Sequence, residues 1–251
     1  MQVVREELSP ICASTRASGT KTPADNHVFQ SNVLSRLGYT SCGLGLAWIA
    51  AIAVGFHLMM AHETTAGPEA SAPALWPSAS FVPSTPGHAT VLMLAHPKCP
   101  CTAASLTQLE LALRESTRSA SPVKAYVLFT QPPGASDKKS WAETPLVRRA
   151  SRMPGVEVHM DPAGREANLF GASTSGQVLA YNADRRLIFA GGLTPGRGVS
   201  GASSDSSALV KALTETTRAP AETRTPVFGC SLMGVSPSAP NRSPCCTETA
   251  K

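Results

Sequence analysis

The sequence has few aromatic residues and no concentration of basic ones. Phe, Trp and Tyr make up 5% of the 251 residues, and the 22 Lys and Arg are scattered along a chain with a formal net charge of +5. Nucleic-acid binding relies on a basic stripe, or on aromatic side chains against which bases stack. The composition therefore argues against nucleic acid as a partner.

Charged residues are absent between Arg36 and Glu63. Within this gap lies the almost wholly apolar segment 43–61, GLGLAWIAAIAVGFHLMMA. Nineteen residues at the helical rise span about 30 Å, the thickness of the hydrocarbon core of a bilayer. We expect one transmembrane helix over 43–61, not a cleaved signal, because 42 residues precede it and no small-x-small cleavage site follows closely.

Lys and Arg are also absent from residues 62–97, whereas Arg5, Arg16, Lys21 and Arg36 precede the apolar segment. The cytoplasmic flanks of membrane helices are enriched in these basic residues. We therefore expect a single-pass protein of the bacterial inner membrane with a cytoplasmic N-terminus. The C-terminal part would then lie in the periplasm, where disulfides persist.

Sustained hydrophobic periodicity is missing from three further stretches. Residues 1–42 are expected to form a flexible cytoplasmic tail, and residues 218–251 a polar C-terminal tail. Residues 62–88 are rich in Pro, Ala and Ser, which is typical of a semi-extended linker.

Residues 89–217, by contrast, alternate between strand-like and helix-like patterns. Runs such as TVLMLA and VKAYVLF are typical of buried strands, and leucines at helical spacing lie between them. The predicted order is β-α-β-α-β-α-β-β-α. It indicates an α/β sandwich with a mainly parallel sheet, helices on both faces and an antiparallel edge.

The segment 96–101, HPKCPC, falls between the first predicted strand and the first predicted helix. Reactive groups collect at this end of a strand, where the next helix presents unpaired N–H groups. Pro100 suits the first helical position and Cys99 the cap, so the helix dipole, Lys98 and His96 should lower the pKa of Cys99. A disulfide from Cys99 to Cys101 would close a small, strained ring and form an oxidising couple.

Residues 89–217 resemble the thioredoxin-like superfamily, since a strand, a Cys motif at a helix start, a βαβ half and a closing ββα half occur in that order. The segments HPKCPCTAASL, TSGQVLAYNADRRLIFAGGLTPGRG and TPVFGCSL are similar to bacterial membrane-anchored RedB-like proteins. The resemblance implies thiol–disulfide exchange with thiol- or disulfide-containing proteins, without a cofactor. Cys99 would be the attacking thiol and Cys101 the resolving thiol.

Two features depart from the thioredoxin pattern. The motif is C-x-C and not C-x-x-C, and residues 173–176, STSG, lack the proline that thioredoxins carry just before the fourth strand. In thioredoxins that proline shapes the substrate groove and helps to keep metals away from the thiols. Both substrate handling and metal exclusion are therefore expected to differ.

Cys230 lies in VFGC, beyond the last predicted helix. It is either a third thiol at the motif or a small buried hydrophobic residue. Two alternatives to redox exchange stay open: a copper-binding or metallochaperone-like protein using Cys99, Cys101 and either Cys230 or His96, and a catalytically idle interaction module. Thiolates favour Cu(I), whereas no second close ligand pair completes a zinc site.

Overall fold

The computed structural model describes residues 25–85, 87–118, 123–134, 138–201, 203–215 and 222–233. The chain divides into two compact units, residues 1–57 and 58–251. Residues 1–24 of the expected N-terminal tail, and residues 218–221 and 234–251 of the expected C-terminal tail, lie outside the described residues. Residues 222–233 are described, and the expectation of a tail there is corrected, because they add a short strand to the sheet.

Helix α1 (Asp25–Thr64) is longer than the helix expected over 43–61. Its part from Ser41 to Thr64 has a mean hydropathy of 2.0, and by length and composition it is able to cross a membrane. The expectation of a flexible tail up to residue 42 is corrected, because residues 25–42 are helical. No proline interrupts the chain between Pro23 and Pro68, so a helix can propagate through this stretch.

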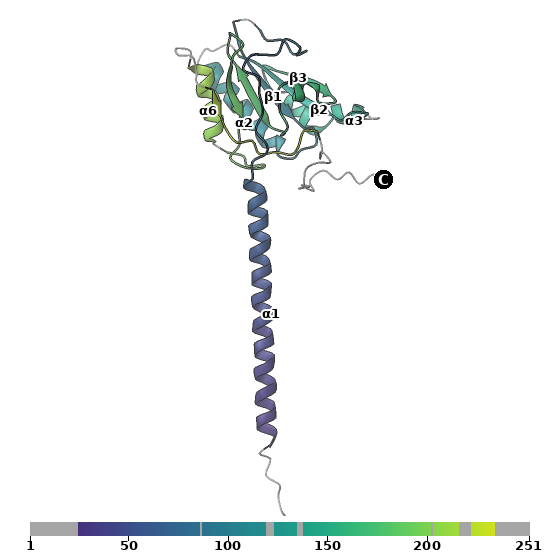
Figure 1. The fold of residues 1–251 in the computed structure, drawn as a ribbon, viewed down its shortest axis with the longest axis vertical. Coiled ribbons are helices and arrows are strands. Elements are labelled where there is room, and N and C mark those ends of the chain that lie inside the picture. Colours follow the sequence, from purple (N-terminus) through teal and green to yellow (C-terminus); the bar gives the residue numbers. More distant parts are fainter. Residues whose placement is uncertain are drawn as a thin grey trace, which may run out of the picture. The chain divides into compact units, whose positions relative to one another are not determined.

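One sheet contains six strands in the order β3-β2-β1-β4-β5-β6. Figure 1 labels β1, β2 and β3 of this sheet. β1, β2 and β3 are parallel, β4 is antiparallel to β1, β5 is antiparallel to β4, and β6 is parallel to β5. The bounds are β1 (Ala89–Ala95), β2 (Val123–Gln131), β3 (Val156–Pro162), β4 (Gln177–Tyr181), β5 (Leu187–Gly191) and β6 (Thr223–Arg224). The predicted α/β class, with its antiparallel closing strands, is confirmed.

Two hydrophobic clusters cover the two faces of the sheet. Val91 and Met93 of β1 point into the cluster formed with helices α2 (Thr102–Arg118), α4 (Pro145–Ala150) and α6 (Ser204–Thr214). Leu92 and Leu94 point into the opposite cluster, which includes α5 (Arg165–Leu169). The short helix α3 (Lys138–Ala142) precedes α4, so two helices stand where the sequence predicted one.

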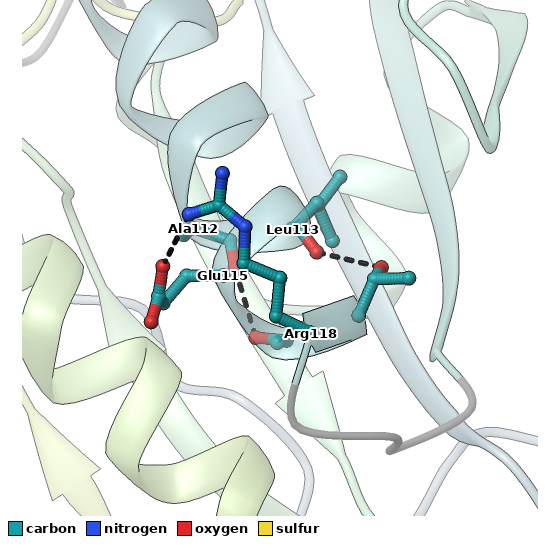
Figure 2. Close-up of polar contacts among 6 residues, drawn as sticks. Ala112, Leu113, Glu115 and Arg118 are labelled. Carbon is teal, nitrogen blue, oxygen red and sulfur yellow. Dashed lines mark hydrogen bonds and ion pairs between the residues drawn. The ribbon is translucent and has the colours of Figure 1, made fainter.

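Polar side chains near the end of helix α2 bond within the helix. The hydroxyl of Ser116 donates to Ala112 O at 2.9 Å, that of Thr117 donates to Leu113 O at 2.8 Å, and Arg118 pairs with Glu115 at 3.1 Å. Figure 2 labels Ala112, Leu113, Glu115 and Arg118. The bonds give the two hydroxyl donors acceptors within the helix itself. Helix α2 runs from Thr102, directly after the Cys motif, to Arg118.

Residues 65–85 are not the semi-extended linker that their composition predicts. Trp76 is buried and packs edge-on against Phe170 and Tyr181, with ring centroids 5.0 and 5.1 Å apart. The backbone N–H of Trp76 donates to Arg185 O at 2.9 Å, and Ser80 Oγ donates to the buried Glu166. The correction has a hydrophobic cause: a few apolar side chains among the prolines cover the sheet face opposite α2 and α6.

Candidate functional site: a cluster of three thiols

The Cys motif forms a tight turn between β1 and α2. The backbone N–H of Cys99 donates to His96 O, and that of Thr102 donates to Cys99 O, both at 3.1 Å. These are i to i+3 bonds, so the chain makes a tighter turn before the regular helix begins at Thr102. Pro100 and Cys101 therefore lie in this turn, ahead of the helix. The expectation that Cys99 caps a helix beginning at Pro100 is corrected, because the regular helix begins two residues later, at Thr102.

Three cysteines meet at this turn. Cys99 Sγ and Cys230 Sγ are hydrogen-bonded at 2.9 Å, although they are 131 residues apart in sequence. The Cys101 side chain is hydrogen-bonded to both of them. Cys99 has an exposed fraction of 0%, whereas Cys101 and Cys230 are partly exposed. All three are thiols and are not joined by a disulfide.

The cluster shifts the pKa values of Cys99 and Cys101 in opposite directions. Hydrogen bonds from Cys101 and then Cys230 hold the pKa of Cys99 far below its usual value, against the opposing effect of burial. The expected direction is found, but neighbouring thiols and not Lys98 are the cause. A hydrogen bond with Cys230 lowers the pKa of Cys101, but the hydrogen bond with Cys99, burial and the charge of Cys99 raise it to about 11. The cluster therefore favours the thiolate form of Cys99 and the protonated form of Cys101.

Cys230 belongs to a segment that we call the C-terminal strap, residues 226–233. The strap pairs with the loop before β4: Ser175 N–H donates to Cys230 O at 2.7 Å, and Leu232 N–H donates to Ser173 O at 2.9 Å. Thr174 and Ser231 form an antiparallel bridge between these bonds. Backbone pairing therefore fixes the position of Cys230.

Two glycines allow the strap and loop to approach so closely. A Cβ on Gly229 would lie 1.9 Å from Ser175 O, a distance that no side chain tolerates. Gly176 has a φ of +92°, and its N–H donates to Leu94 O at 2.9 Å. Only glycine adopts that backbone angle without strain.

Ser175 connects the loop before β4 with the Cys motif. Its Oγ accepts the N–H of His96 at 2.9 Å and is hydrogen-bonded to Thr102 Oγ1 at 3.0 Å. Ser175 and Thr102 are both buried. The loop that lacks the thioredoxin proline is thus tied to both ends of the Cys turn.

His96, Lys98 and Trp141 form the rim of the site. The His96 ring meets Trp141 edge-on at 5.6 Å, and Lys98 Nζ lies 4.0 Å from the centre of the Trp141 ring. Burial lowers the pKa of His96, an effect that the charge of Cys99 partly offsets, so the imidazole is neutral at neutral pH. His96 therefore adds no positive charge beside the thiols.

The chain is similar to several solved structures of low sequence identity. An uncharacterized conserved protein from Geobacillus kaustophilus is 20% identical, with a TM-score of 0.47, over 70% of this chain and 95% of its own. ScoI of Arabidopsis thaliana, solved with copper bound, is 13% identical, with a TM-score of 0.37, over 51% and 84%. The exposed thioredoxin lipoprotein of Streptococcus pneumoniae is 17% identical, with a TM-score of 0.33, over 51% and 85%. No family model and no curated protein matches the sequence.

The sheet itself decides the fold class. The parallel unit β1-α2-β2 and the antiparallel unit β4-β5-α6 share one sheet, with the Cys motif at the start of α2. These are the two halves expected from the sequence. The fold is thioredoxin-like. To it are added β3 at one edge, β6 at the other and the strap across the thiols.

Sequence reasoning missed Arg197, which anchors the strap of this thioredoxin-like domain. Its guanidinium donates to Gly229 O and, through Nε, to His62 O at 3.0 Å. Its positive charge also acts to lower the pKa of Cys101. Arg197 is one of 22 basic residues, in a glycine-rich turn, so no local pattern marks it.

The described part of the chain contains no preformed metal site, since no group of three or more potential ligand side chains there is arranged to hold an ion. The 2.9 Å contact between Cys99 and Cys230 is one reason. Two thiolates on one metal ion lie about 3.7 Å apart when each metal–sulfur bond is ~2.3 Å and the geometry is tetrahedral. These two sulfurs would have to separate before they shared an ion.

Proposed function

We propose that the chain is a membrane-anchored, RedB-like thiol–disulfide oxidoreductase that acts on disulfide-containing proteins in the bacterial periplasm. One observation carries the proposal: Cys99, at the end of β1, is in hydrogen-bond contact with two other thiols. Such contacts stabilise a thiolate, which is the form that attacks disulfides. The exchange needs no cofactor.

The two thiols of the Cys-Pro-Cys motif divide the chemistry. The Cys99 thiolate attacks one sulfur of a partner disulfide, and the other partner sulfur leaves as a thiolate. Attack consumes the charge of Cys99, and that charge is one cause of the high pKa of Cys101. Cys101 then loses its proton more easily, attacks Cys99 Sγ and releases the second partner thiolate. The partner gains two electrons, and the motif is left as a disulfide.

The anchor is helix α1, whose segment Ser41–Thr64 suits a bilayer by length and composition. The basic residues before this segment favour a cytoplasmic N-terminus and a periplasmic thioredoxin-like domain. Protease added to spheroplasts should then digest the domain while a tag at the N-terminus stays protected. Digestion of the tag with the domain intact would reverse the proposed orientation.

The redox function is tested with the full chain in detergent micelles. Wild type is expected to reduce or reshuffle a disulfide-bonded protein in a glutathione buffer, and Cys99→Ser is expected to be inert. Cys42→Ser is the matched control, because Cys42 is an exposed thiol of α1. Equal inertness of wild type and Cys99→Ser would contradict the proposal and favour an idle interaction module.

Cu(I) binding is the second candidate, favoured by the three thiols that gather around Cys99. Soft thiolates prefer this ion. Titration of the reduced full chain with Cu(I) against a chromophoric chelator tests it. Stoichiometric uptake that Cys99→Ser abolishes, without exchange activity in wild type, would favour copper handling over redox exchange.

A further inference from the structure

The strap creates an accessibility problem for exchange at Cys99. With the strap in place, the exposed fraction of Cys99 is 0%, so direct attack by Cys99 on a partner disulfide requires the strap to move aside first. Cys230 is partly exposed and lies in direct contact with Cys99. Cys230 therefore offers a reachable sulfur that lies 2.9 Å from the buried sulfur of Cys99.

The position of Cys230 is specified by its backbone. Bonds to Ser175 and Ser173 hold the strap on both sides of the bridge between Thr174 and Ser231. Val227 and Leu232 are buried, and Thr130 Oγ1 donates to Leu232 O at 3.2 Å. The contact between Cys99 and Cys230 is thus built by main-chain pairing and buried side chains at both ends of the strap.

We propose that Cys230 is the partner-facing thiol of a three-thiol relay and that the oxidised protein rests with a disulfide between Cys99 and Cys230. The relay rests on the proposed redox function, and it names the entry point of that same site. The strap is then a working part of the site and not a terminal extension.

Each step of the relay balances. The Cys230 thiol first passes its proton to the Cys99 thiolate across their hydrogen bond. The Cys230 thiolate then attacks one sulfur of a partner disulfide, and the other partner sulfur leaves and takes up the proton from Cys99. The Cys99 thiolate finally attacks Cys230 Sγ, so that the Cys99–Cys230 bond forms and the second partner thiolate leaves. The partner gains two electrons, which the Cys99 and Cys230 sulfurs give up in forming their bond. Attack of Cys101 on Cys99 Sγ would pass the bond to the Cys-Pro-Cys pair and release Cys230.

Entry through Cys101 is the competing route, since Cys101 is also partly exposed. Resolution of an adduct on Cys101 would close the short Cys-x-Cys ring, whose geometry departs from that of relaxed disulfides. Resolution of an adduct on Cys230 joins residues 131 apart, and no short ring is formed. The contact distance and the ring size both favour Cys230.

The test uses full-length variants, glutathione disulfide as the probe and peptide mass mapping under non-reducing conditions. Cys99→Ser, quenched early in the reaction, should carry glutathione on Cys230, because Cys99 is missing and only Cys101, which holds its proton more tightly, is left to resolve the adduct. Cys101→Ser should accumulate the Cys99–Cys230 disulfide. Cys230→Ser should exchange about tenfold more slowly or worse, because it lacks a thiol held at high effective concentration next to Cys99.

Three outcomes would overturn the relay and leave the redox function standing. In the first, Cys230→Ser exchanges at the wild-type rate while Cys99→Ser is inert. In the second, the glutathione adduct forms on Cys101 and not on Cys230, and in the third, Cys101→Ser forms no Cys99–Cys230 disulfide. Wild type that fails to react with any disulfide removes the redox function itself. Gly229→Ala tests whether the position of Cys230 matters, since this variant keeps every thiol but its added Cβ would displace the strap from Ser175. The relay expects this variant to be as slow as Cys230→Ser.

Discussion

Removing one thiol neighbour of Cys99 should raise its pKa by an amount that the hydrogen bonds set. Cys101→Ala removes the first of two S–H donors and Cys230→Ala removes the second. A hydrogen bond to a charged group contributes about 1.5–3 kcal/mol. One pKa unit corresponds to about 1.4 kcal/mol, so each variant should raise the Cys99 pKa by about one to two units.

The ultraviolet absorbance of the thiolate measures this pKa directly. The full chain is titrated, and the curve of the matching variant that also carries Cys99→Ser is subtracted, which removes the other cysteines. Cys42→Ser serves as the control and should leave the Cys99 curve unchanged, because Cys42 is an exposed residue of α1. An unchanged Cys99 pKa in both Cys101→Ala and Cys230→Ala would refute the view that thiol donors hold the charge.

The same shift predicts how stability depends on pH. The folded pKa of Cys99 lies below its ordinary value of 9.0, so the stability it contributes is present above that value and is lost as pH falls through the folded pKa. Cys101 acts in the opposite sense. Its folded pKa is raised to about 11, so the stability that it contributes is present below its ordinary value of 9.0 and is lost as pH rises from 9.0 through the folded pKa. Urea unfolding of wild type against Cys99→Ser should therefore differ more at neutral pH than in acid.

Two further substitutions test the burial of Trp76 and the effect of the Arg197 charge on Cys101. Trp76→Ala should lower the free energy of unfolding of the thioredoxin-like domain by about 3–5 kcal/mol in urea, since it removes one ring from a buried aromatic cluster. Trp48→Ala, at an exposed residue of α1, is the control and should leave that transition unchanged. A near-wild-type Trp76→Ala would mean that residues 65–85 are a linker after all. Arg197→Gln should raise the Cys101 pKa further, since it removes a positive charge that acts on Cys101; a fall in that pKa would contradict the assigned effect.

The sequence carries enough local pattern to predict the sheet and the apolar helix. Short, nearly continuous apolar runs in β1, β2, β4 and β5 become buried strands, and leucines at helical spacing place α2 on one face. The packing of residues 65–85 could not be predicted in this way, because Trp76 lies among prolines in a segment without hydrophobic periodicity. Its burial depends on a sheet face left uncovered by helices, which only the assembled fold defines.

The cluster of thiols shows the same limit at the site. HPKCPC marks Cys99 and Cys101 by its own composition, and their neighbourhood follows from their spacing. Cys230 is 131 residues away from Cys99, and it approaches through main-chain bonds between the strap and the loop before β4. Main-chain pairing over such a separation leaves no periodic signal in either segment.

The proline missing before β4 has a structural counterpart in the strap. Ser175 N–H donates to Cys230 O at 2.7 Å, and a proline at this position has no N–H to donate. Ser175→Pro should therefore weaken strap docking, by about 1 kcal/mol for the bond alone, and reduce the Cys99–Cys230 disulfide about fivefold relative to glutathione. Ser175→Ala is the matched control, since it keeps the N–H and loses only the hydroxyl contacts with His96 and Thr102. If both variants retain the disulfide equally, the strap does not depend on this N–H; if Ser175→Pro alone loses it, the absence of proline is what allows a third thiol to reach the site.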